Sequence, residues 1–270
     1  MYPKSKVLII AGSDSSGGAG IQADIKTVTL LGSYAMTAVT AVTAQNTMGV
    51  KKITPIPKQN VQKQITMILD DIGADAVKIG MLYNVSIIKG VHHILKKYNL
   101  KNIVIDPVMV AKGGARLINN NSITYLKKLL LPLAKLITPN IPEAEVLSGC
   151  SISNKEDMIQ AAKKIINMGP KNVLLKGGHL RSKMIFDILA TKKEIKVFQK
   201  RKIITKNTHG TGCTLSSALA TCLSQKKSIF KSCKISLKYV DRAITYAPGY
   251  GKGFGPLNHL VLINSRNINV

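Results

Sequence analysis

Two glycines stand close before a cysteine in the segment KNTHGTGCTLSSA, residues 206–218. Gly210 and Gly212 allow a tight backbone turn, and the small residues after Cys213 are typical of a closely packed helix. Backbone N–H groups in the first turn of a helix lack partners and lie at the positive end of the helix dipole, so they bind anions. The segment therefore predicts a phosphate site formed by Gly210, Thr211 and Gly212, with the Cys213 thiol beside it.

The same position suggests a chemical role for Cys213. A lone cysteine is most often a small buried apolar residue that takes no part in catalysis. A helix N-terminus, however, lowers the pKa of a thiol below its reference value of about 8.5, and the resulting thiolate can act as a base. We predict that Cys213 is such a base; an ordinary loop-to-helix turn with a buried cysteine is the alternative.

Charged residues follow three later apolar runs. Asp106 ends NIVID, Glu143 lies in NIPE and Lys176 follows NVLL. Two carboxylates can hold Mg²⁺ beside nucleotide phosphates, often through water, and a lysine can contact phosphate. Taken singly, each of these residues also fits a turn, a helix cap or a solvated surface.

Two further polar residues, Asp24 and Gln45, lie after the first two apolar runs. Asp24 lies one turn into the helix expected after the glycine loop GSDSSGG, and Gln45 lies in TAQN. A side-chain amide offers a donor and an acceptor, so Gln45 can match the edge of an aminated heterocycle. The alternative is that Asp24 is an ordinary helix residue without a role in binding, and that Gln45 only forms hydrogen bonds with backbone groups.

Short apolar runs alternate with amphipathic patterns along the chain, and this alternation would bring those residues together. Helices are expected over 20–31 and 58–72, with Gly32 and Gly73 at their C-termini. Continuous Val/Ile/Leu strands alternating with helices indicate an α/β fold with a mostly parallel sheet covered on both faces. Ligands of such folds bind beyond the carboxyl ends of the strands, where the candidate residues fall. The runs KMIFDILAT and EIKVFQ, separated by two lysines, predict a hairpin at one sheet edge.

Composition narrows the classes of function. The formal net charge is +26, but the 34 lysines are spread along the chain, there are only five arginines, and 4% of residues are aromatic. Nucleic-acid binding is therefore not the expected main function. Four cysteines without C-x-x-C spacing predict neither a disulfide framework nor a zinc site and indicate reduced thiols in the cytoplasm. The first apolar run is too short for a signal sequence or a membrane span.

Together the motifs resemble the hydroxymethylpyrimidine/phosphomethylpyrimidine kinases of thiamine biosynthesis, within the ribokinase-like superfamily. The similarity runs nearly end to end, through AGSDSSGGAGIQAD, TAVTAQNTMGV, KIGML, DPVMVAKGG, LITPNIPEAEVL, LLKGGH and TKNTHGTGCTLSSALA. It implies a single three-layer α/β/α domain over residues 1–270, without a separate lid, that acts as a homodimer. The implied enzyme uses ATP and Mg²⁺ to phosphorylate 4-amino-5-hydroxymethyl-2-methylpyrimidine to its monophosphate and then to the diphosphate.

The resemblance also implies roles for single residues. Asp24 and Gln45 would bind the pyrimidine, with Met81 and Val108 as apolar walls. The anion hole and the base would be formed by Gly210, Thr211, Gly212 and Cys213. The metal would be held by Asp106 and Glu143. The phosphate would be contacted by Lys176.

Three residues depart from the family's pattern. Gly113 and Ala115 stand where Ser and Asp are frequent, so a loop over the site is expected to differ, and Lys252 stands where a histidine is usual. None of the three belongs to the proposed catalytic set.

Three other functions stay open at this point. The first is pyridoxal kinase activity at the same site, because pyridoxal also carries a ring-borne hydroxymethyl group. The second is a cysteine hydrolase that pairs His209 with Cys213. The third is a polyanion-binding protein without turnover, which would bind RNA in a salt-sensitive way.

Overall fold

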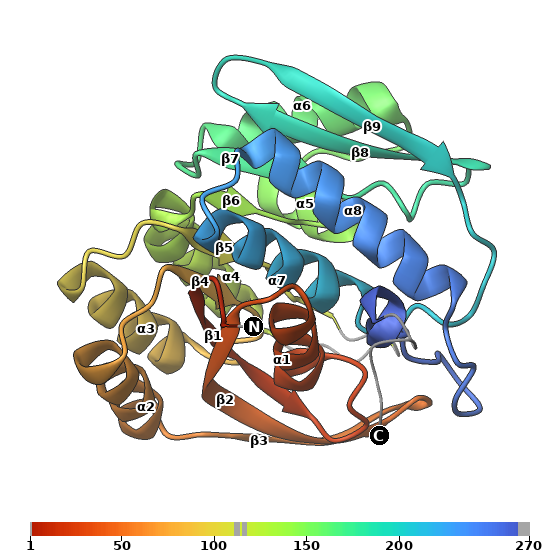
Figure 1. Ribbon diagram of the computed structural model, residues 1–270. Coiled ribbons are helices and arrows are strands. Elements are labelled where there is room, and N and C mark those ends of the chain that lie inside the picture. Colours follow the sequence, from red (N-terminus) through yellow and green to blue (C-terminus); the bar gives the residue numbers. More distant parts are fainter. Residues whose placement is uncertain (1, 111–113, 115–117, 264–270) are drawn as a thin grey trace.

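The computed structural model describes residues 2–110, 114 and 118–263, so Gly113 and Ala115 lie outside the described part. Its strands are β1 (Lys6–Asp14), β2 (Tyr34–Asn46), β3 (Gly49–Pro55), β4 (Ala76–Ile79), β5 (Ile103–Ile105), β6 (Leu136–Ile137), β7 (Asn172–Leu175), β8 (Met184–Thr191) and β9 (Ile195–Arg201). The described residues form a nine-stranded sheet in the order β3-β2-β1-β4-β5-β6-β7-β8-β9 (Figure 1).

Six neighbouring strands, from β2 to β7, pair in parallel, as the apolar runs predict. The predicted hairpin is confirmed, because β8 and β9 pair antiparallel and end the sheet. At the other edge β3 pairs antiparallel with β2. Strand β3 was not predicted from the sequence. Lys51 and Lys52 make β3 polar, and Pro55 ends it, as is common for edge strands.

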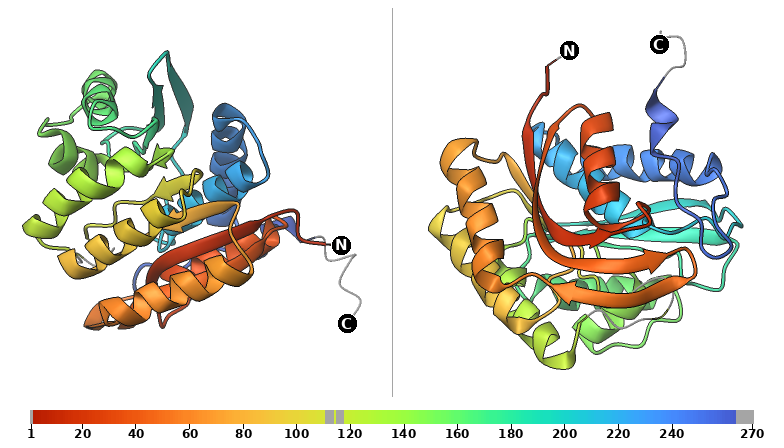
Figure 2. Two further views of the ribbon diagram at one scale, coloured as in Figure 1. Left: turned by 90° about the vertical axis from the view of Figure 1, so that its left-hand side faces the viewer. Right: turned by 90° about the horizontal axis from the view of Figure 1, so that it is seen from below.

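The helices cover both faces of the sheet. They are α1 (Gly20–Leu30), α2 (Lys58–Asp71), α3 (Val85–Lys97), α4 (Asn120–Tyr125), α5 (Ile141–Ser148), α6 (Lys155–Ile166), α7 (Thr211–Ser224) and α8 (Ile229–Thr245), with short turns η1 (Leu126–Leu130), η2 (Leu131–Leu133) and η3 (His259–Leu262). One face carries α1, α7 and α8, and the other carries α2 to α6 (Figure 2). This is the predicted three-layer α/β/α arrangement.

The ends of α1 and α2 agree with the expected glycine stops. Gly32 and Gly73 both have left-handed backbone angles, with φ of 82° and 73°. The N–H of Gly73 bonds to the carbonyl of Ile68 and so closes the last turn of α2.

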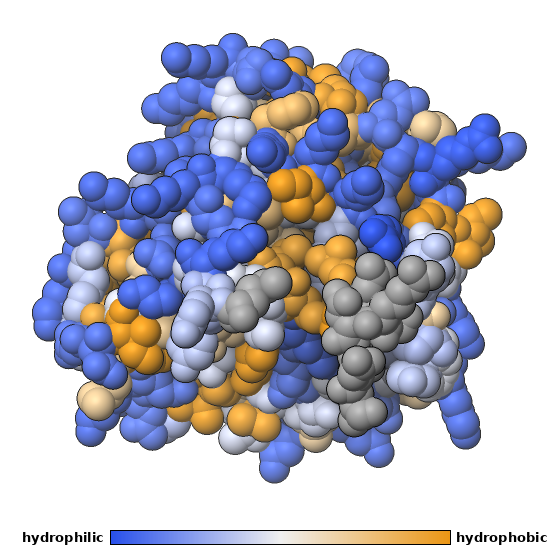
Figure 3. All heavy atoms as spheres, viewed as in Figure 1, coloured by the Kyte–Doolittle hydropathy of each residue, from blue (hydrophilic) through white to orange (hydrophobic). Residues whose placement is uncertain are grey.

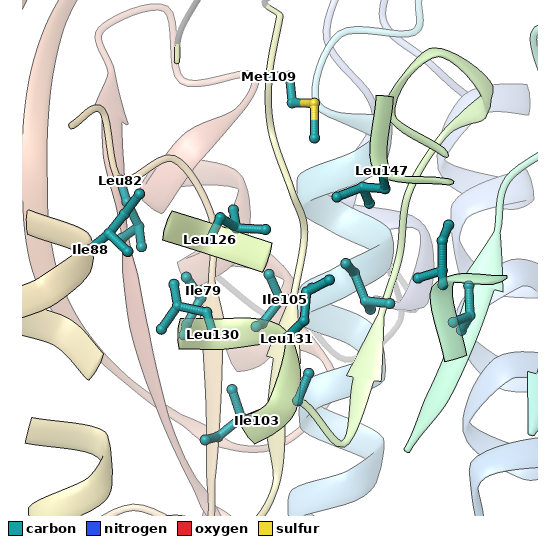
Figure 4. Packing of buried hydrophobic residues seen from close by; sticks show 14 of the residues in the cluster. Ile79, Leu82, Ile88, Ile103, Ile105, Met109, Leu126, Leu130, Leu131 and Leu147 are labelled. Carbon is teal, nitrogen blue, oxygen red and sulfur yellow. The ribbon is translucent and has the colours of Figure 1, made fainter. Parts of the chain in front are cut away.

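A large apolar core fixes the strands beneath α2 to α6. Ile79, Ile103 and Ile105 of the sheet pack against helix residues such as Ile88 and Leu130 (Figure 4). Each such fully buried side chain contributes about 1.5–3 kcal/mol relative to an exposed one. The carboxyl ends of β4 and β5, which carry candidate site residues, therefore have a rigid support.

The face of the molecule seen in Figure 1 is largely hydrophilic. Figure 3 shows hydrophilic residues spread over much of the face seen in Figure 1, with smaller apolar areas between them. Within the described ranges, no helix is both long enough and apolar enough to cross a bilayer.

Candidate active site

A cavity of about 700 Å³ opens at the carboxyl ends of the parallel strands, where α/β folds bind ligands. Ten of the eleven candidate residues line it: Gln45, Met81, Asp106, Val108, Glu143, Lys176, Gly210, Thr211, Gly212 and Cys213. The sheet order spreads them along the cavity, from Gln45 on β2, past Asp106 after β5, to Lys176 after β7. Asp24 alone lies behind the cavity wall.

The glycine turn before α7 has the geometry of an anion hole. Gly210 is the N-cap of α7 with φ of 84°, and a Cβ there would overlap the carbonyl oxygen of Gly18. A glycine cap also has no side chain to accept from the first turn. The Thr211 N–H donates to the Thr208 carbonyl at 3.3 Å, so the N–H groups of Gly212 and Cys213 are the ones left for a ligand. A Cβ on Gly212 would lie 3.2 Å from an Asp106 oxygen and 3.4 Å from the Lys176 nitrogen. The turn therefore faces the charged residues closely.

The thiol of Cys213 does not have the low pKa that its position predicts. Burial raises its pKa to about 12; Lys78 acts in the opposite direction, and Asp24 and Asp106 raise it further. The expectation of a depressed pKa is therefore wrong for the ligand-free protein, because loss of water outweighs the helix N-terminus. The thiol carries its proton at neutral pH.

Asp106 and Lys176 form an ion pair on the floor of the cavity. The Lys176 ammonium lies 3.1 Å from Asp106 Oδ1, and Thr138 donates to the same oxygen at 3.2 Å. Burial acts to lower the pKa of Lys176, but Asp106 and Glu143 raise it above its ordinary value. The lysine thus keeps its positive charge beside the anion hole.

Glu143 closes a capping box at the start of α5. Its carboxylate accepts from the Asn140 N–H at 2.8 Å, and the Asn140 side chain accepts from the Glu143 N–H at 3.0 Å. The spacing of these two residues is a usual helix start. Burial raises the Glu143 pKa to about 7. Lys176 acts to lower this pKa, and Asp106 acts to raise it. The charge of Glu143 therefore changes near neutral pH.

The carboxylates of Asp106 and Glu143 can bind Mg²⁺ only if phosphate and water supply its remaining ligands. Within the described residues no three His, Cys, Asp or Glu side chains gather into a metal site. Magnesium commonly binds one or two carboxylates and takes its remaining ligands from phosphate and water. Asp106 and Glu143 beside the glycine turn fit that pattern.

Gln45 lies at the opposite end of the cavity from the hairpin. Thr43 donates to its amide oxygen at 3.2 Å, and its amide nitrogen lies 3.4 Å from Nε2 of His209. Met81 and Val108 pack with Ala41 into a small apolar cluster at this end. An oriented amide beside an apolar wall suits a flat ring with polar edges.

A second buried pair, between Asp14 and His209, was not predicted from the sequence. His209 Nε2 lies 2.7 Å from Asp14 Oδ2, and Asp14 also accepts from the backbone of Ser16 and Ala19. Burial would raise the Asp14 pKa, but the bonds to His209 and Ser16 outweigh it and lower the pKa to about 2. The pair joins the first glycine loop to the loop before α7. The sequence did offer an indication of this pair, because Asp14 is a carboxylate within the glycine loop GSDSSGG.

This pair also removes the support for a cysteine hydrolase. The Nε2 atom of His209 is engaged by Asp14 and Gln45 and not by the Cys213 sulfur. A nucleophile activated by histidine needs direct hydrogen-bond contact between the two groups.

Asp24 is placed differently from its predicted role. It is completely buried in α1 and binds the Lys78 ammonium at 2.7 Å, while Lys78 itself reaches the cavity wall. The resemblance implies that Asp24 binds the pyrimidine. The helix instead turns its carboxylate inward, where it contacts Lys78 and Ser217.

Lys252 lies exposed on the loop that leads to η3. The adjoining Gly253 and Phe254 donate backbone hydrogen bonds to Thr47, the first residue after β2. The substitution therefore changes the surface next to the pyrimidine end and none of the cavity contacts described above.

This sheet, with a glycine-capped helix facing a lysine–aspartate pair at its carboxyl edge, defines a ribokinase-like kinase. Residues 14–258 match the model of the phosphomethylpyrimidine kinase family, and the chain belongs to that family. It is 44% identical to hydroxymethylpyrimidine/phosphomethylpyrimidine kinase of Bacillus subtilis over 255 residues, 94% of each protein. It is 48% identical to a thiamine biosynthesis bifunctional protein of Geobacter sulfurreducens, covering 96% of this chain and 53% of that protein, so it spans about half of it.

Solved structures show the same fold. The crystal structure of phosphomethylpyrimidine kinase from Clostridium difficile matches with a TM-score of 0.80 and 45% identity, covering 89% of this chain and 99% of that one. An ADP complex of Bacillus subtilis pyridoxal kinase matches with a TM-score of 0.88 and 37% identity, covering 96% and 98%. The fold is therefore shared by kinases named for two different acceptors.

Proposed function

We propose that this chain uses ATP to phosphorylate 4-amino-5-hydroxymethyl-2-methylpyrimidine and then its monophosphate, in thiamine biosynthesis. The observation that carries the proposal is the glycine turn of Gly210 to Cys213, which meets the Asp106–Lys176 pair in one cavity with Gln45 at its far end. Relatives named for both phosphorylations support the choice of acceptor.

The nucleotide fits the end of the cavity nearest the hairpin and α8. Leu237, Val240 and Ile244 form an apolar wall there, beside the ion pair of Lys200 with Asp241. Such a wall suits the base of ATP, and the triphosphate then extends toward Lys176. The solved ADP complex of Bacillus subtilis pyridoxal kinase, which has the same fold, supports nucleotide binding by this chain.

In the first reaction the acceptor hydroxyl attacks the γ-phosphorus, and the bond from that phosphorus to the bridging oxygen of ADP breaks. The N–H groups of the glycine turn stabilise the negative oxygens of the group in transfer. The hydroxyl proton passes to the Cys213 sulfur, which must be a thiolate to accept it. Asp106 and Glu143 would hold Mg²⁺, which supplies charge neutralisation between the phosphate groups.

Gln45 should contribute strongly to recognition of the ring. An amide can pair a ring nitrogen and the exocyclic amine together, and leaving such buried groups unpaired costs about 1–3 kcal/mol. Gln45→Leu should therefore raise the pyrimidine Kd by roughly five- to 150-fold. Calorimetry with the pyrimidine and, as a control, with ATP measures it; unchanged pyrimidine affinity in a folded variant would remove Gln45 from the site.

Glu143 should make the magnesium requirement depend on pH. Its pKa is about 7, so the ligating carboxylate form is scarce at pH 6 and predominates at pH 8. The Mg²⁺ concentration for half-maximal rate should therefore fall as pH rises through 7. Glu143→Gln should require more Mg²⁺ and lose this dependence, and magnesium titrations that superimpose on wild type would show the carboxylate to be purely structural.

We also propose that residues 1–270 act as one kinase domain, as a homodimer in the cytoplasm. The four cysteines are free, which agrees with a reducing compartment. Light scattering of the purified chain measures the oligomeric state.

Pyridoxal kinase activity is the second candidate, favoured by the similarity to solved pyridoxal kinases. An ADP-release assay with the pyrimidine alcohol, its monophosphate and pyridoxal separates the two. The proposal expects kcat/KM for both pyrimidines to exceed that for pyridoxal. Turnover with pyridoxal alone would reject it in favour of the second candidate.

A further inference from the structure

A buried ion pair lies directly beneath the catalytic turn. Lys78, on the central strand β4, and Asp24, on α1, are both completely buried, with 2.7 Å between the ammonium and Oδ2. Ser217 of α7 donates to the other oxygen of Asp24, also at 2.7 Å. Lysine is almost never fully buried without a partner. The mechanism described above uses neither member of the pair directly.

The pair lies one helical turn below Cys213. Asp24 follows Gly20 by four residues on α1, and Ser217 follows Cys213 by four residues on α7, so each couple shares one helix face. Gly20 and Cys213 are also in contact, because a backbone hydrogen bond from Gly20 to the Cys213 thiol lowers the thiol pKa. The two helices therefore face each other at two levels, with Cys213 at the cavity and Asp24 beneath it.

The Lys78 residue forms part of the cavity wall from this lower level. A Cβ on Gly80 would lie 2.9 Å from its nitrogen, so the glycine leaves room for it. An ammonium has three donors, and Asp24 is its hydrogen-bond partner among the described residues. Its other two donors have no hydrogen-bond partner among the described residues.

The titratable groups that act on Lys78 come from three elements. They are Asp24 of α1, Cys213 of α7 and Asp106 after β5. Burial acts to lower the pKa of Lys78, but these three groups raise it well above its usual value, so it stays a cation. On the pKa of Cys213, the lowering effect of Lys78 is larger than the raising effect of Asp24 or of Asp106.

We propose that Lys78, held in place by Asp24 and Ser217, is a positioning residue that sets a fixed positive charge against the Cys213 sulfur and so favours its thiolate. The use of that thiolate as a base rests on the proposed function; the charge relationship does not. In the transfer step the substrate proton goes to sulfur, and Lys78 keeps its own protons throughout.

The test measures the reactivity of Cys213 in the ligand-free full-length protein. Iodoacetamide alkylates the thiolate, and peptide mass spectrometry gives a rate for Cys213, with the half-buried Cys150 as internal reference. Lys78→Met should slow Cys213 about tenfold or more, since one pKa unit changes the thiolate fraction tenfold. Asp24→Asn should accelerate it, because the positive charge is then no longer balanced.

The opposite signs separate this role from a structural one. If the pair merely held the helices together, both variants would loosen the site and both would accelerate alkylation, and that result would overturn the proposal. An unchanged rate in Lys78→Met would overturn it as well. Where Lys78→Met does not fold, Lys78→Met/Asp24→Asn leaves no unpaired charge. It should still react more slowly than wild type, and a rate equal to or above wild type rejects the proposal.

Kinetics keep this inference distinct from the proposed function. Lys78→Met should lower kcat for the alcohol by about tenfold or more and change the monophosphate reaction much less. Opposite alkylation shifts without any turnover of the pyrimidines would support the charge role of Lys78 and reject the proposed function. Equal losses with both acceptors, together with unchanged alkylation, would reject the charge role alone.

Discussion

Cys213→Ala should slow phosphorylation of the pyrimidine alcohol by roughly a hundred- to ten-thousand-fold, which is the usual contribution of a positioned general base. Phosphorylation of the monophosphate should fall far less. Its nucleophile is a phosphate oxygen that is already anionic near neutral pH, because its second pKa is about 6. The substitution keeps the backbone N–H groups of the glycine turn, so single-step assays with each acceptor separate the base from the anion hole.

The pH dependence of the same two reactions gives a matched control. The Cys213 pKa is about 12, so the thiolate fraction and the alcohol rate should rise about tenfold per pH unit between pH 7 and 9. The monophosphate rate should level off above pH 6 to 7, and the alcohol rate of Cys213→Ala should lose its slope. Equal losses with both acceptors would mean that another group takes the proton.

Gly210→Ala should reduce both phosphorylations together, by at least roughly a hundredfold. The residue has φ of 84°, and a Cβ would overlap the Gly18 carbonyl oxygen, so the turn must move. The N–H groups that face the transferring phosphate then lose their alignment, and a single such donor contributes about 10²–10³ in kcat. The expected measurement is kcat for each acceptor at saturating ATP.

Gly149→Ala is the control for this substitution. Gly149 also has a positive φ, of 70°, but a Cβ there meets nothing within 4 Å, and the residue does not line the cavity, so it tests the left-handed backbone alone. It should retain most activity with both acceptors. A Gly210→Ala variant that is as active as Gly149→Ala would contradict the anion hole.

Local patterns in the sequence were sufficient for much of the fold and the site. The glycine turn before Cys213, the hairpin from β8 to β9 and the glycine stops at Gly32 and Gly73 each depend on neighbouring residues alone. Asp106 and Lys176 follow strands that lie near each other in the sheet, so the rule for ligand sites at strand ends brought them together.

Other features depend on contacts that no short segment reveals. Cys213 is half-buried where α1 packs against α7, and the loss of water there reverses the expected shift of the thiol pKa. The inward turn of Asp24 depends on a lysine 54 residues further along. The pair of Asp14 with His209 joins residues 195 positions apart. Strand β3 is a polar edge strand, and its pairing with β2 decides its conformation more than its composition does.

The central claim is that one site carries out both phosphorylations of the pyrimidine. Phosphorus NMR of a single reaction, with the enzyme, excess ATP, Mg²⁺ and the pyrimidine alcohol, follows every product directly. The account predicts that the monophosphate resonance rises first and is then replaced by the two resonances of the diphosphate, and that Gly210→Ala slows both phases. A reaction that consumes no ATP with the pyrimidine alcohol, or that stops at the monophosphate, would contradict it.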